Sequence, residues 1–402
     1  MRPMSDFKKL EDFDFNGKRV LVRADLNVPV AGGKVSDSTR IVRLGPTISH
    51  IIEHGGTPVL LSHFGRPKGE VNADFSLEFI VTAIQNAFGQ PVDFIKTDWV
   101  DVTSAKAQLD AGAKGTIYVM ENTRFHPGEE KNDTELAARM ASLGDIYLND
   151  AFSAAHRAHA STAAIAHQLP SGAGRAMEME LSALEAGLGK PKKPVIALVG
   201  GAKVSTKLDL LENLIHKVEA LVIGGGMANT FLHSQGIDIG KSLCEKDLAD
   251  TARRIYDKAA DANCAIILPI DGVVAWHFEA NAPNRTYGVE AMDPTGMMLD
   301  VGDHSIERIK GAIDEAKTLI WNGPLGAFEL DPFGKGTIEV AQHAAKRTRD
   351  GKLVSVAGGG DTVAALAKAK VVNDFTYVST AGGAFLEWME GKPLPGVEAL
   401  NA

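Results

Sequence analysis

The amino-acid sequence predicts an α/β protein with two domains, each built on a parallel β-sheet. Its 402 residues are too many for one ordinary hydrophobic core and enough for two. Hydrophobic residues make up 45% of the chain and charged residues 23%, which is the balance of an ordinary globular protein. Short apolar or β-branched runs alternate with amphipathic stretches along the chain, and this alternation is typical of βαβ units.

Nine short runs are the predicted strands, and many of them end in Gly, Asn, Asp or His. Ligands of such folds bind at the carboxyl ends of the strands, so we expect the functional residues there. The pattern therefore predicts two Rossmann-like three-layer αβα domains. In chain order the runs are RVLVRAD (19–25), PVLLSH (58–63), TIYVMEN (116–122), DIYLND (145–150), PVIALVG (194–200), ALVIGGG (220–226), AIILP (265–269), TLIWNGP (318–324) and KLVSVAGGG (352–360).

The domain boundary is predicted near the middle of the chain. Residues 175–189 carry apolar side chains at helical spacing, and residues 190–194 (KPKKP) read as a connector before the next strand. We therefore expect one domain over 1–189 and a second over 190–390, joined by a hinge helix. The tail 391–402 is too short for a domain and is expected to pack back on the first one.

Charge and cysteine content restrict the class of protein. The formal net charge of -9 argues against a protein that mainly coats nucleic acid or an anionic membrane. The first residues lack a signal-peptide pattern, and no later apolar run reaches membrane-spanning length, so a cytoplasmic location is expected. Cys244 and Cys264 lack zinc-ligand spacing and are interpreted as reduced thiols.

The first half places cationic side chains beyond predicted strands or at helix starts. Guanidinium groups grip phosphate and carboxylate with paired hydrogen bonds, so together these arginines predict a cradle for a phosphorylated acid. Asp25 and Asn27 either cap a turn or orient a substrate hydroxyl. His156 and His159 lack a carboxylate ligand set, which disfavours a metal site. The segments are Arg23–Asn27, Asp37–Arg40, Ser62–Pro67, Glu121–His126 and His156–Ser161.

The second half is rich in glycine turns between strands and helices. Glycines let backbone amides approach phosphate oxygens, and a helix amino end favours an anion. Lys203 and Lys207 are four residues apart, so a helix would place both ammonium groups on one face, either around a phosphoryl group or simply in solvent. Asp361, after Gly358–Gly360, either contacts magnesium bound to nucleotide phosphates or caps a helix.

Several familiar signatures are absent from the sequence. It has no GxxxxGK[ST], HRD or DFG motif, which excludes P-loop enzymes and protein kinases. The run Gly224–Asn229 departs from GxGxxG at its last position, so a dinucleotide-dependent oxidoreductase is disfavoured. The remaining rival is a non-catalytic two-domain protein that closes on a phosphorylated ligand, which would leave Lys203 and Lys207 without a role.

The quoted segments resemble the phosphoglycerate kinase family over essentially the whole chain. The motifs are RADLNVP, SHFGRPKG, ENTRFHPGEEKND, NDAFSAAHRAHAS, GGAKVSTKL, WNGPLGAFE, GGGDT and STAGGAFLE, in family order. The resemblance implies an amino-terminal domain for 3-phosphoglycerate or 1,3-bisphosphoglycerate, a carboxy-terminal domain for Mg-ADP or Mg-ATP, hinge closure and a monomer. It implies direct in-line phosphoryl transfer, with Arg40, Lys203 and Lys207 around the migrating group.

The resemblance also implies roles for individual residues. Glu329 is expected on the nucleotide ribose and Asp361 on the magnesium ion. Three departures, Ala381, Phe385 and Met298, affect the expected phosphate turn and adenine pocket. The acid side is expected to comprise Arg23, Asp25, Asn27, Arg40, His63, Arg66, Arg124 and Arg157 with His156 and His159 nearby, and the nucleotide side Lys203, Lys207, Asn322, Glu329, Gly359, Gly360, Asp361 and Thr362.

Overall fold

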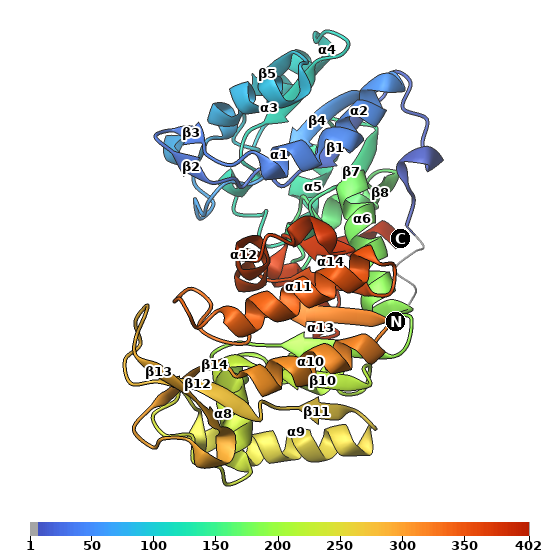
Figure 1. Ribbon diagram of the computed structural model, residues 1–402. Helices are drawn as coiled ribbons and strands as arrows, with labels where there is room; N and C mark the ends of the chain where they lie inside the picture. Colours follow the sequence, from blue (N-terminus) through green and yellow to red (C-terminus); the bar gives the residue numbers. More distant parts are fainter. Residues whose placement is uncertain (1–6, 402) are drawn as a thin grey trace. The chain divides into compact units, whose positions relative to one another are not determined.

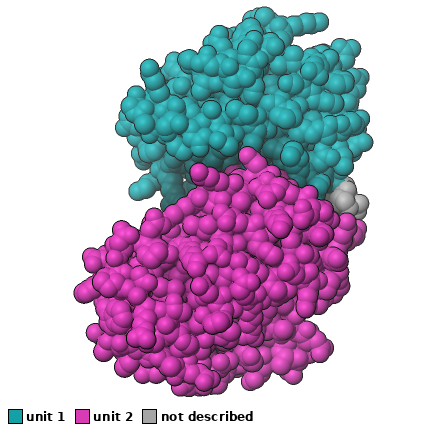
Figure 2. Space-filling model, in the orientation of Figure 1, with its two compact units in different colours: residues 1–182, 393–402 teal, residues 183–392 magenta. Residues whose placement is uncertain are grey.

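The chain divides into two compact units in the computed structural model, which describes residues 7–401. Unit 1 comprises residues 1–182 and 393–402, and unit 2 comprises residues 183–392 (Figure 2). The sequence placed the first boundary later, after Gly189. Helix α6 (Arg175–Leu184) runs through the division and continues into a π-helical turn, η7 (Glu185–Gly189), so no proline or loop signal marks the division itself.

Unit 1 is built on a six-stranded sheet in which every neighbouring pair is parallel. β1 lies in the interior of the sheet between β4 and β7 (Figure 1). A short antiparallel hairpin, β2 (Val30–Ala31) with β3 (Lys34–Val35), follows β1 in the chain. From one edge the strands are β5 (Val92–Ile95), β6 (Ile117–Met120), β4 (Thr57–Leu61), β1 (Arg19–Arg23), β7 (Ile146–Asn149) and β8 (Ser171–Ala173).

Unit 2 repeats this plan with a second six-stranded parallel sheet. A separate antiparallel sheet, in the order β13 (Asn284–Gly288), β12 (Asp271–Ala275), β14 (Met297–Val301), is inserted between β11 and β15 in the chain. From one edge the parallel strands are β11 (Ala265–Ile267), β10 (Ala220–Ile223), β9 (Val195–Val199), β15 (Thr318–Asn322), β16 (Val354–Gly358) and β17 (Tyr377–Ser379).

Helices flank both sheets (Figure 1). In α10, Ile306, Ile309 and Ile313 recur at helical spacing and join the core of unit 2. The helices of unit 1 are α1 (Thr39–Arg43), α2 (Gly45–Glu53), α3 (Val81–Phe88), α4 (Thr103–Asp110), α5 (Thr134–Ala141), most of α6, and α14 (Pro395–Glu398). Those of unit 2 are α7 (Leu208–Leu214), α8 (Gly225–Ser234), α9 (Ala249–Asp261), α10 (Asp303–Glu315), α11 (Lys335–Arg349), α12 (Gly360–Lys368) and α13 (Gly382–Met389).

The central strands are buried along almost their whole length. Val20 and Val22 of β1 pack with Leu60 of β4 and Leu148 of β7 in the core of unit 1. Each fully buried aliphatic side chain of this kind contributes roughly 1.5–3 kcal/mol, which stabilises the sheet and fixes its carboxyl edge. No helix of the described residues 7–401 is long and apolar enough to cross a membrane.

The α/β prediction is confirmed, and all nine predicted runs contain strands. Strands β5, β8 and β17, the β2–β3 hairpin and the three-stranded antiparallel sheet were not predicted. β8 reads Ser-Gly-Ala and has no β-branched residue, while β13 (Asn284–Gly288) is largely exposed and polar. Edge strands of this composition lack the continuous apolar run that identifies a buried strand.

Candidate functional site

The carboxyl ends of β9 and β15 form the centre of the site in unit 2. These two strands are neighbours in the middle of the sheet. The strands after β9 (β10, β11) lie on one side of the pair, and the strands after β15 (β16, β17) lie on the other. A ligand crevice is expected where the strand order reverses in this way. Gly200 follows β9, and a Cβ there would lie 1.8 Å from the carbonyl oxygen of Pro324. Only glycine allows the two loops to approach so closely.

Lys207 joins these two strand ends. Its ammonium group donates hydrogen bonds to the carbonyl oxygen of Gly200 (2.6 Å), to Oδ1 of Asn322 (2.6 Å) and to the carbonyl oxygen of Asn322 (3.2 Å). Burial lowers the pKa of Lys207 to about 8, and the nearby carboxylate of Asp361 opposes this shift. The site therefore holds a desolvated cation beside the glycine turns.

The predicted helical face with Lys203 and Lys207 does not form, so that expectation is wrong. Residues Val204–Thr206 make a 3₁₀ turn, and α7 begins only at Leu208. Lys203 has an extended backbone and an exposed side chain, whereas Lys207 turns inward to the carbonyl groups of the strand ends. The hydrogen bonds of Lys207 outweigh the helical alternative for this segment.

The loop after β16 brings the predicted GGGDT residues to the same place. Nδ2 of Asn322 donates to the carbonyl oxygen of Gly358 (2.8 Å), and the Gly323 amide donates to Oγ1 of Thr362 (2.7 Å). Gly359 caps α12 with φ +100°, a backbone conformation that favours glycine. Asp361 lies exposed in the first helical turn and is not the N-cap, so the capping interpretation of Asp361 is wrong.

These loops line a polar pocket rich in glycine. Backbone amides at the start of α12 and α13 favour an anion there, as does the positive charge of the two lysines. The lining residues are Gly200, Gly201, Ala202, Lys203, Thr206, Lys207, Asn322, Gly323, Gly359, Gly360, Asp361, Thr362, Gly382, Gly383 and Leu386.

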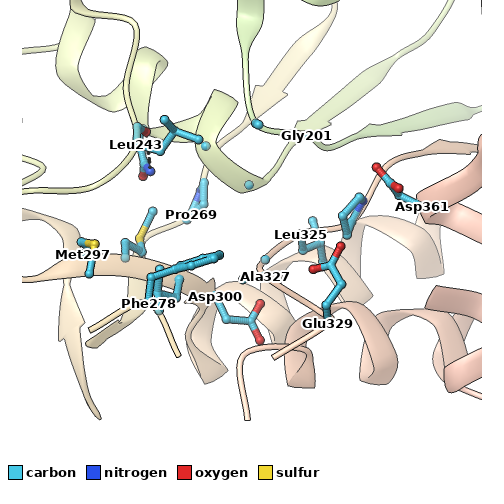
Figure 3. Close-up of a pocket in the computed structure, with 18 residues that line it drawn as sticks. Gly201, Leu243, Pro269, Phe278, Met297, Asp300, Leu325, Ala327, Glu329 and Asp361 are labelled. Carbon is cyan, nitrogen blue, oxygen red and sulfur yellow. Dashed lines mark hydrogen bonds between the residues drawn. The ribbon is translucent and has the colours of Figure 1, made fainter. Parts of the chain in front are cut away.

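An apolar pocket of about 260 Å³ continues from the polar one, since Gly201, Ala202 and Asp361 line both. Figure 3 shows Leu243 and Phe278 on one side of this pocket, with Asp361 on the other. The carboxylate of Glu329 also lines it. Asn229 and Asp300 also line it, and its other walls are glycine backbone and apolar side chains, so it suits a flat, weakly polar group joined to an anionic one.

Sequence reasoning missed most of the apolar wall of this pocket. The family resemblance associated only the stretch 296–300 with an adenine pocket, whereas Leu243, Pro269 and Phe278 come from other segments that no local pattern links to it. The physical signal is that two large apolar side chains of this wall are exposed, Phe278 by 65% and Leu243 by 52%.

The fold accommodates the three departures from the family pattern. Ala381 is the N-cap of α13 and has a negative φ of -97°, so this position does not need the left-handed conformation that favours glycine. Phe385 is fully buried and packs beside Gly358, where a Cβ would meet its ring at 2.5 Å. Met298 packs in the same way against Gly272 and lines the apolar pocket.

In unit 1, Arg23 lies at the end of β1 and is completely buried. Its Nε donates to Oγ of Ser161 (2.9 Å), one terminal nitrogen donates to the carbonyl oxygen of Ala24 (2.5 Å), and the other lies 2.9 Å from Nδ1 of His63. This predicted ligand residue is therefore held rigidly from several sides.

Two histidines of the basic cluster are neutral at pH 7. Burial, followed by the charge of Arg23, holds the pKa of His63 well below its usual range. Burial, followed by the charge of Arg124, lowers the pKa of His159 to about 4. The positive charge of the cluster therefore comes from its arginines.

Asp25 and Asn27 hold a second arginine of the basic cluster, Arg40. Arg40 donates to Oδ1 of Asp25 (2.9 Å) and to the carbonyl oxygen of Asn27 (3.0 Å). Oδ2 of Asp25 accepts from the hydroxyl of Ser153 (2.6 Å), and Oδ1 of Asn27 accepts from the Gly65 amide (3.1 Å). Ser153 was quoted within a motif but was not predicted as a site residue.

The remaining predicted residues of unit 1 differ in exposure. Arg124 is half-buried and donates to the carbonyl oxygen of Gly65 (2.9 Å). Arg66 and Arg157 are exposed, and Nε of Arg157 lies 3.3 Å from Nε2 of the neighbouring His156. The structure thus brings Arg23, Arg40, His63, Arg124, Arg157 and His159 into one electrostatically coupled cluster, while Arg66 is exposed in the adjoining loop.

The residues present fit a nucleotide-bound magnesium ion better than a protein metal site. Among the described residues no group of three or more His, Cys, Asp or Glu side chains could hold a metal ion. Magnesium bound to nucleotide phosphates needs only one or two carboxylates, because phosphate and water oxygens supply the other ligands. Asp361, exposed in the polar pocket, provides such a carboxylate.

Unit 2 of this α/β protein has an apolar pocket that continues into a glycine-rich polar pocket with Lys207, and unit 1 has a separate basic cluster. These are the features of a phosphotransferase that acts on a nucleotide and a small anion. The family model described as phosphoglycerate kinase matches residues 10–392. The chain therefore belongs to the phosphoglycerate kinase family. Enzymes of this family transfer a phosphoryl group between phosphoglycerate and ADP or ATP.

Individual relatives support the same membership. The phosphoglycerate kinase of Rhodopseudomonas palustris is 64% identical over 395 residues, covering 98% of both chains, and that of Bradyrhizobium diazoefficiens is 61% identical with the same coverage. The solved structure of phosphoglycerate kinase from Coxiella burnetii matches with a TM-score of 0.91 at 42% identity, covering 98% of each chain. That from Pyrococcus horikoshii matches with a TM-score of 0.79 at 29% identity and the same coverage.

Proposed function

We propose that this chain catalyses reversible transfer of the acyl phosphate of 1,3-bisphosphoglycerate to ADP, giving 3-phosphoglycerate and ATP, in glycolysis and gluconeogenesis. The observation that carries the proposal is the continuity of the two pockets of unit 2, where an apolar slot opens into a glycine-rich pocket with two lysines. This combination suits a nucleoside diphosphate or triphosphate. The identity of the acid substrate is inferred from membership of the phosphoglycerate kinase family.

In unit 2 the nucleotide base would occupy the apolar pocket, with Glu329 binding the ribose. The phosphates would lie against Gly359, Gly360 and Thr362 at the start of α12, where backbone amides and the helix dipole favour anions. Asn322 and Lys207 complete this side. Asp361 would hold the magnesium ion, which neutralises phosphate charge when it is bound.

In unit 1 the basic cluster would bind the phosphorylated acid. The arginines grip its phosphate and carboxylate oxygens with charge-assisted hydrogen bonds, and the neutral His63 adds a donor. Asp25 and Asn27 orient the hydroxyl group of the acid or the loops around it. The proposed ligands are Arg23, Asp25, Asn27, Arg40, His63, Arg66, Arg124 and Arg157, with His156 and His159 nearby.

The transfer needs no nucleophilic side chain. A β-phosphate oxygen of ADP attacks the phosphorus atom in line, the bond from phosphorus to the acyl oxygen breaks, and the carboxylate leaves with the bonding electron pair. The loose transition state spreads charge over three equatorial oxygens, so catalysis depends on positioned cations. Arg40 belongs to unit 1 and Lys203 and Lys207 to unit 2, so we propose that closure about a hinge brings them together and excludes water.

A coupled assay tests the activity. Purified protein with 1,3-bisphosphoglycerate, ADP and magnesium should form ATP and 3-phosphoglycerate, and chelation of magnesium should stop the reaction. Tight binding of both ligands without any ATP formation would instead favour the rival, a non-catalytic protein that closes on a phosphorylated ligand.

The stereochemical course tests the in-line step. With a chiral, isotopically labelled phosphoryl group, one direct displacement inverts configuration at phosphorus, whereas transfer through a phosphorylated side chain retains it. Retention would refute direct transfer while leaving the overall reaction in place.

We also propose that the protein acts as a cytoplasmic monomer. The support is the resemblance to the family together with the absence of a membrane-spanning helix in the described part of the chain. Light scattering of the purified protein should give a mass near 42.7 kDa, and twice that mass would overturn the monomer.

A further inference from the structure

We propose that Glu129 and Ser161 are positioning residues of the basic cluster, which orient the guanidinium group of Arg23 and through it select the ring tautomer of His63. The inference rests on the proposed function of this cluster as the acid site. It assigns a role to two residues that would not touch the substrate.

A continuous chain of hydrogen bonds links the four side chains. Arg23, Ser161 and Glu129 are each 0% exposed. Nε of Arg23 donates to Oγ of Ser161 (2.9 Å), and this hydroxyl in turn donates to Oε1 of Glu129 (2.5 Å). At the other end, a terminal nitrogen of Arg23 lies 2.9 Å from Nδ1 of His63.

The chemistry of the groups fixes the direction of each bond. A guanidinium group can only donate, an ionised carboxylate can only accept, and a hydroxyl has a single proton. Ser161 must therefore accept from Arg23 and give its proton to Glu129. The Ser161 amide (2.9 Å) and the Thr123 hydroxyl (3.1 Å) also donate to Glu129, so three donor groups hold the carboxylate in place.

The same logic determines the state of His63. Because Arg23 cannot accept, Nδ1 of His63 must be the acceptor, and the proton of the neutral ring lies on Nε2. Burial and the arginine charges keep this ring neutral, because both lower its pKa. His63 thus presents an N–H donor rather than a lone pair, as an anion site requires.

Glu129 also accounts for the buried charge of Arg23. Among the described residues no carboxylate forms a direct ion pair with Arg23. The negative group linked to it through hydrogen bonds is Glu129, with the hydroxyl of Ser161 between them. A fully buried cation without a compensating anion is strongly destabilised. Removal of the Ser161 hydroxyl breaks this series of hydrogen bonds, so the guanidinium group of Arg23 should no longer be held in one orientation.

The test combines Ser161→Ala and Glu129→Gln with a matched control, Tyr147→Phe. The hydroxyl of Tyr147 donates to the carbonyl oxygen of Ser161 (2.8 Å), so its removal deletes a buried hydrogen bond at the same residue but leaves the chain intact. Nitrogen NMR of the histidine-labelled, ligand-free full chain reports the His63 tautomer. Calorimetry reports the affinity for 3-phosphoglycerate.

We expect wild type and Tyr147→Phe to show His63 protonated on Nε2, and both Ser161→Ala and Glu129→Gln to show a mixture of tautomers. Affinity should fall about 10- to 100-fold in these two variants and less than threefold in the control. Ser161→Thr, which keeps the hydroxyl, should restore the single tautomer. If Ser161→Ala does not fold, Glu129→Gln carries the test because it preserves the side-chain shape.

Unchanged His63 signals in folded Ser161→Ala or Glu129→Gln would overturn the inference. An equal loss of 3-phosphoglycerate affinity in Tyr147→Phe would also overturn it. The NMR measurement needs no substrate, so it stands apart from the proposed function. If the wild-type protein fails to bind 3-phosphoglycerate but His63 still responds to the variants, the acid site is refuted and the positioning of His63 is not.

Discussion

The ammonium nitrogen of Lys207 lies 2.6 Å from Oδ1 of Asn322, at the point where β9 and β15 end side by side. The same nitrogen lies 2.6 Å from the carbonyl oxygen of Gly200, so one cation joins the two strand ends. Lys207 is therefore both a support of the loops and the charge beside the proposed phosphate pocket. Substitution should affect stability and turnover together.

Lys207→Met should lower kcat by about 10²- to 10³-fold, because the transition state loses a positioned cation. It should also lower the free energy of unfolding by about 1–3 kcal/mol, since three hydrogen bonds to partly buried oxygens are lost. Steady-state kinetics and urea unfolding measure the two effects. Lys217→Met, which removes another partly buried lysine of unit 2, should leave kcat unchanged. Equal kinetics in both variants would remove Lys207 from the site.

The pH dependence of stability provides a second measurement on the same side chain. The pKa of Lys207 is about 8 in the folded protein and near 10.5 in an unfolded chain. Between these values the unfolded state binds more protons, so the stability contributed by Lys207 rises with pH. The difference in unfolding free energy between wild type and Lys207→Met should therefore increase from pH 8 to pH 10.5. A constant difference across this range would show that burial does not lower the pKa.

Arg40→Ala should leave the fold intact and lower kcat by about 10²- to 10³-fold. Arg40 is held by Asp25 and the carbonyl group of Asn27 but is about one-third exposed, so its ion pair contributes little to stability. Circular dichroism and the coupled assay measure both. Arg43→Ala, on the same helix, is the charge-matched control and should retain turnover. Near wild-type turnover in folded Arg40→Ala would exclude Arg40 from the reaction.

The sequence predicted the central strands of both sheets because each is a short run of buried apolar residues, as in Val195–Val199. It also predicted that the Gly and Asn residues at the carboxyl ends of these runs gather at one edge, and Gly200, Asn322 and Gly358 do so. The edge strand Ser171–Ala173 could not be predicted, since its residues carry no strand signal.

The geometry of the site side chains could not be predicted from sequence patterns. Spacing suggested that Lys203 and Lys207 share a helical face, but tertiary hydrogen bonds of Lys207 override this local preference. The total burial of Arg23 depends on Ser161 and Glu129, which lie over a hundred residues further along the chain. The apolar pocket likewise depends on Phe278, which no motif includes.

Gly359→Ala should destabilise the loop that precedes α12. Gly359 has φ +100°, and an added Cβ would meet Nδ2 of Asn322 at 2.8 Å, so the substitution combines backbone strain with a steric conflict. We expect a loss of about 1–3 kcal/mol in unfolding free energy and at least tenfold weaker ADP binding, measured by urea unfolding and calorimetry.

Gly311→Ala is the matched control for this prediction. Gly311 lies within α10, and a Cβ there would meet nothing within 4 Å. Alanine should stabilise this helix by about 0.5–1 kcal/mol and leave ADP affinity unchanged. A Gly359→Ala protein as stable as wild type, with unaltered ADP affinity, would contradict the strained loop.

Asp300→Asn should remove a pH dependence of stability between pH 4 and pH 7. Burial raises the pKa of Asp300 to about 7, although the amides of Gly336 (2.8 Å) and Val301 (2.9 Å) donate to its carboxylate and oppose the shift, as does the charge of Lys335. Glu339 adds to the increase. Between the ordinary pKa of 3.8 and about 7 the folded state binds more protons than the unfolded state. The stability contributed by Asp300 therefore falls as pH rises through this window, by about 4 kcal/mol at most.

Urea unfolding of wild type and Asp300→Asn at several pH values measures this effect. The unfolding free energy of wild type should decline relative to that of the variant from pH 4 to pH 7 and then level off. A carboxyl group with an ordinary pKa would give parallel profiles over the same range. Because Asp300 lines the apolar pocket and holds the amino end of α11 through Gly336, the ADP affinity of wild type should change over the same pH window as its stability. That coupling should be absent from Asp300→Asn, whose side chain does not titrate.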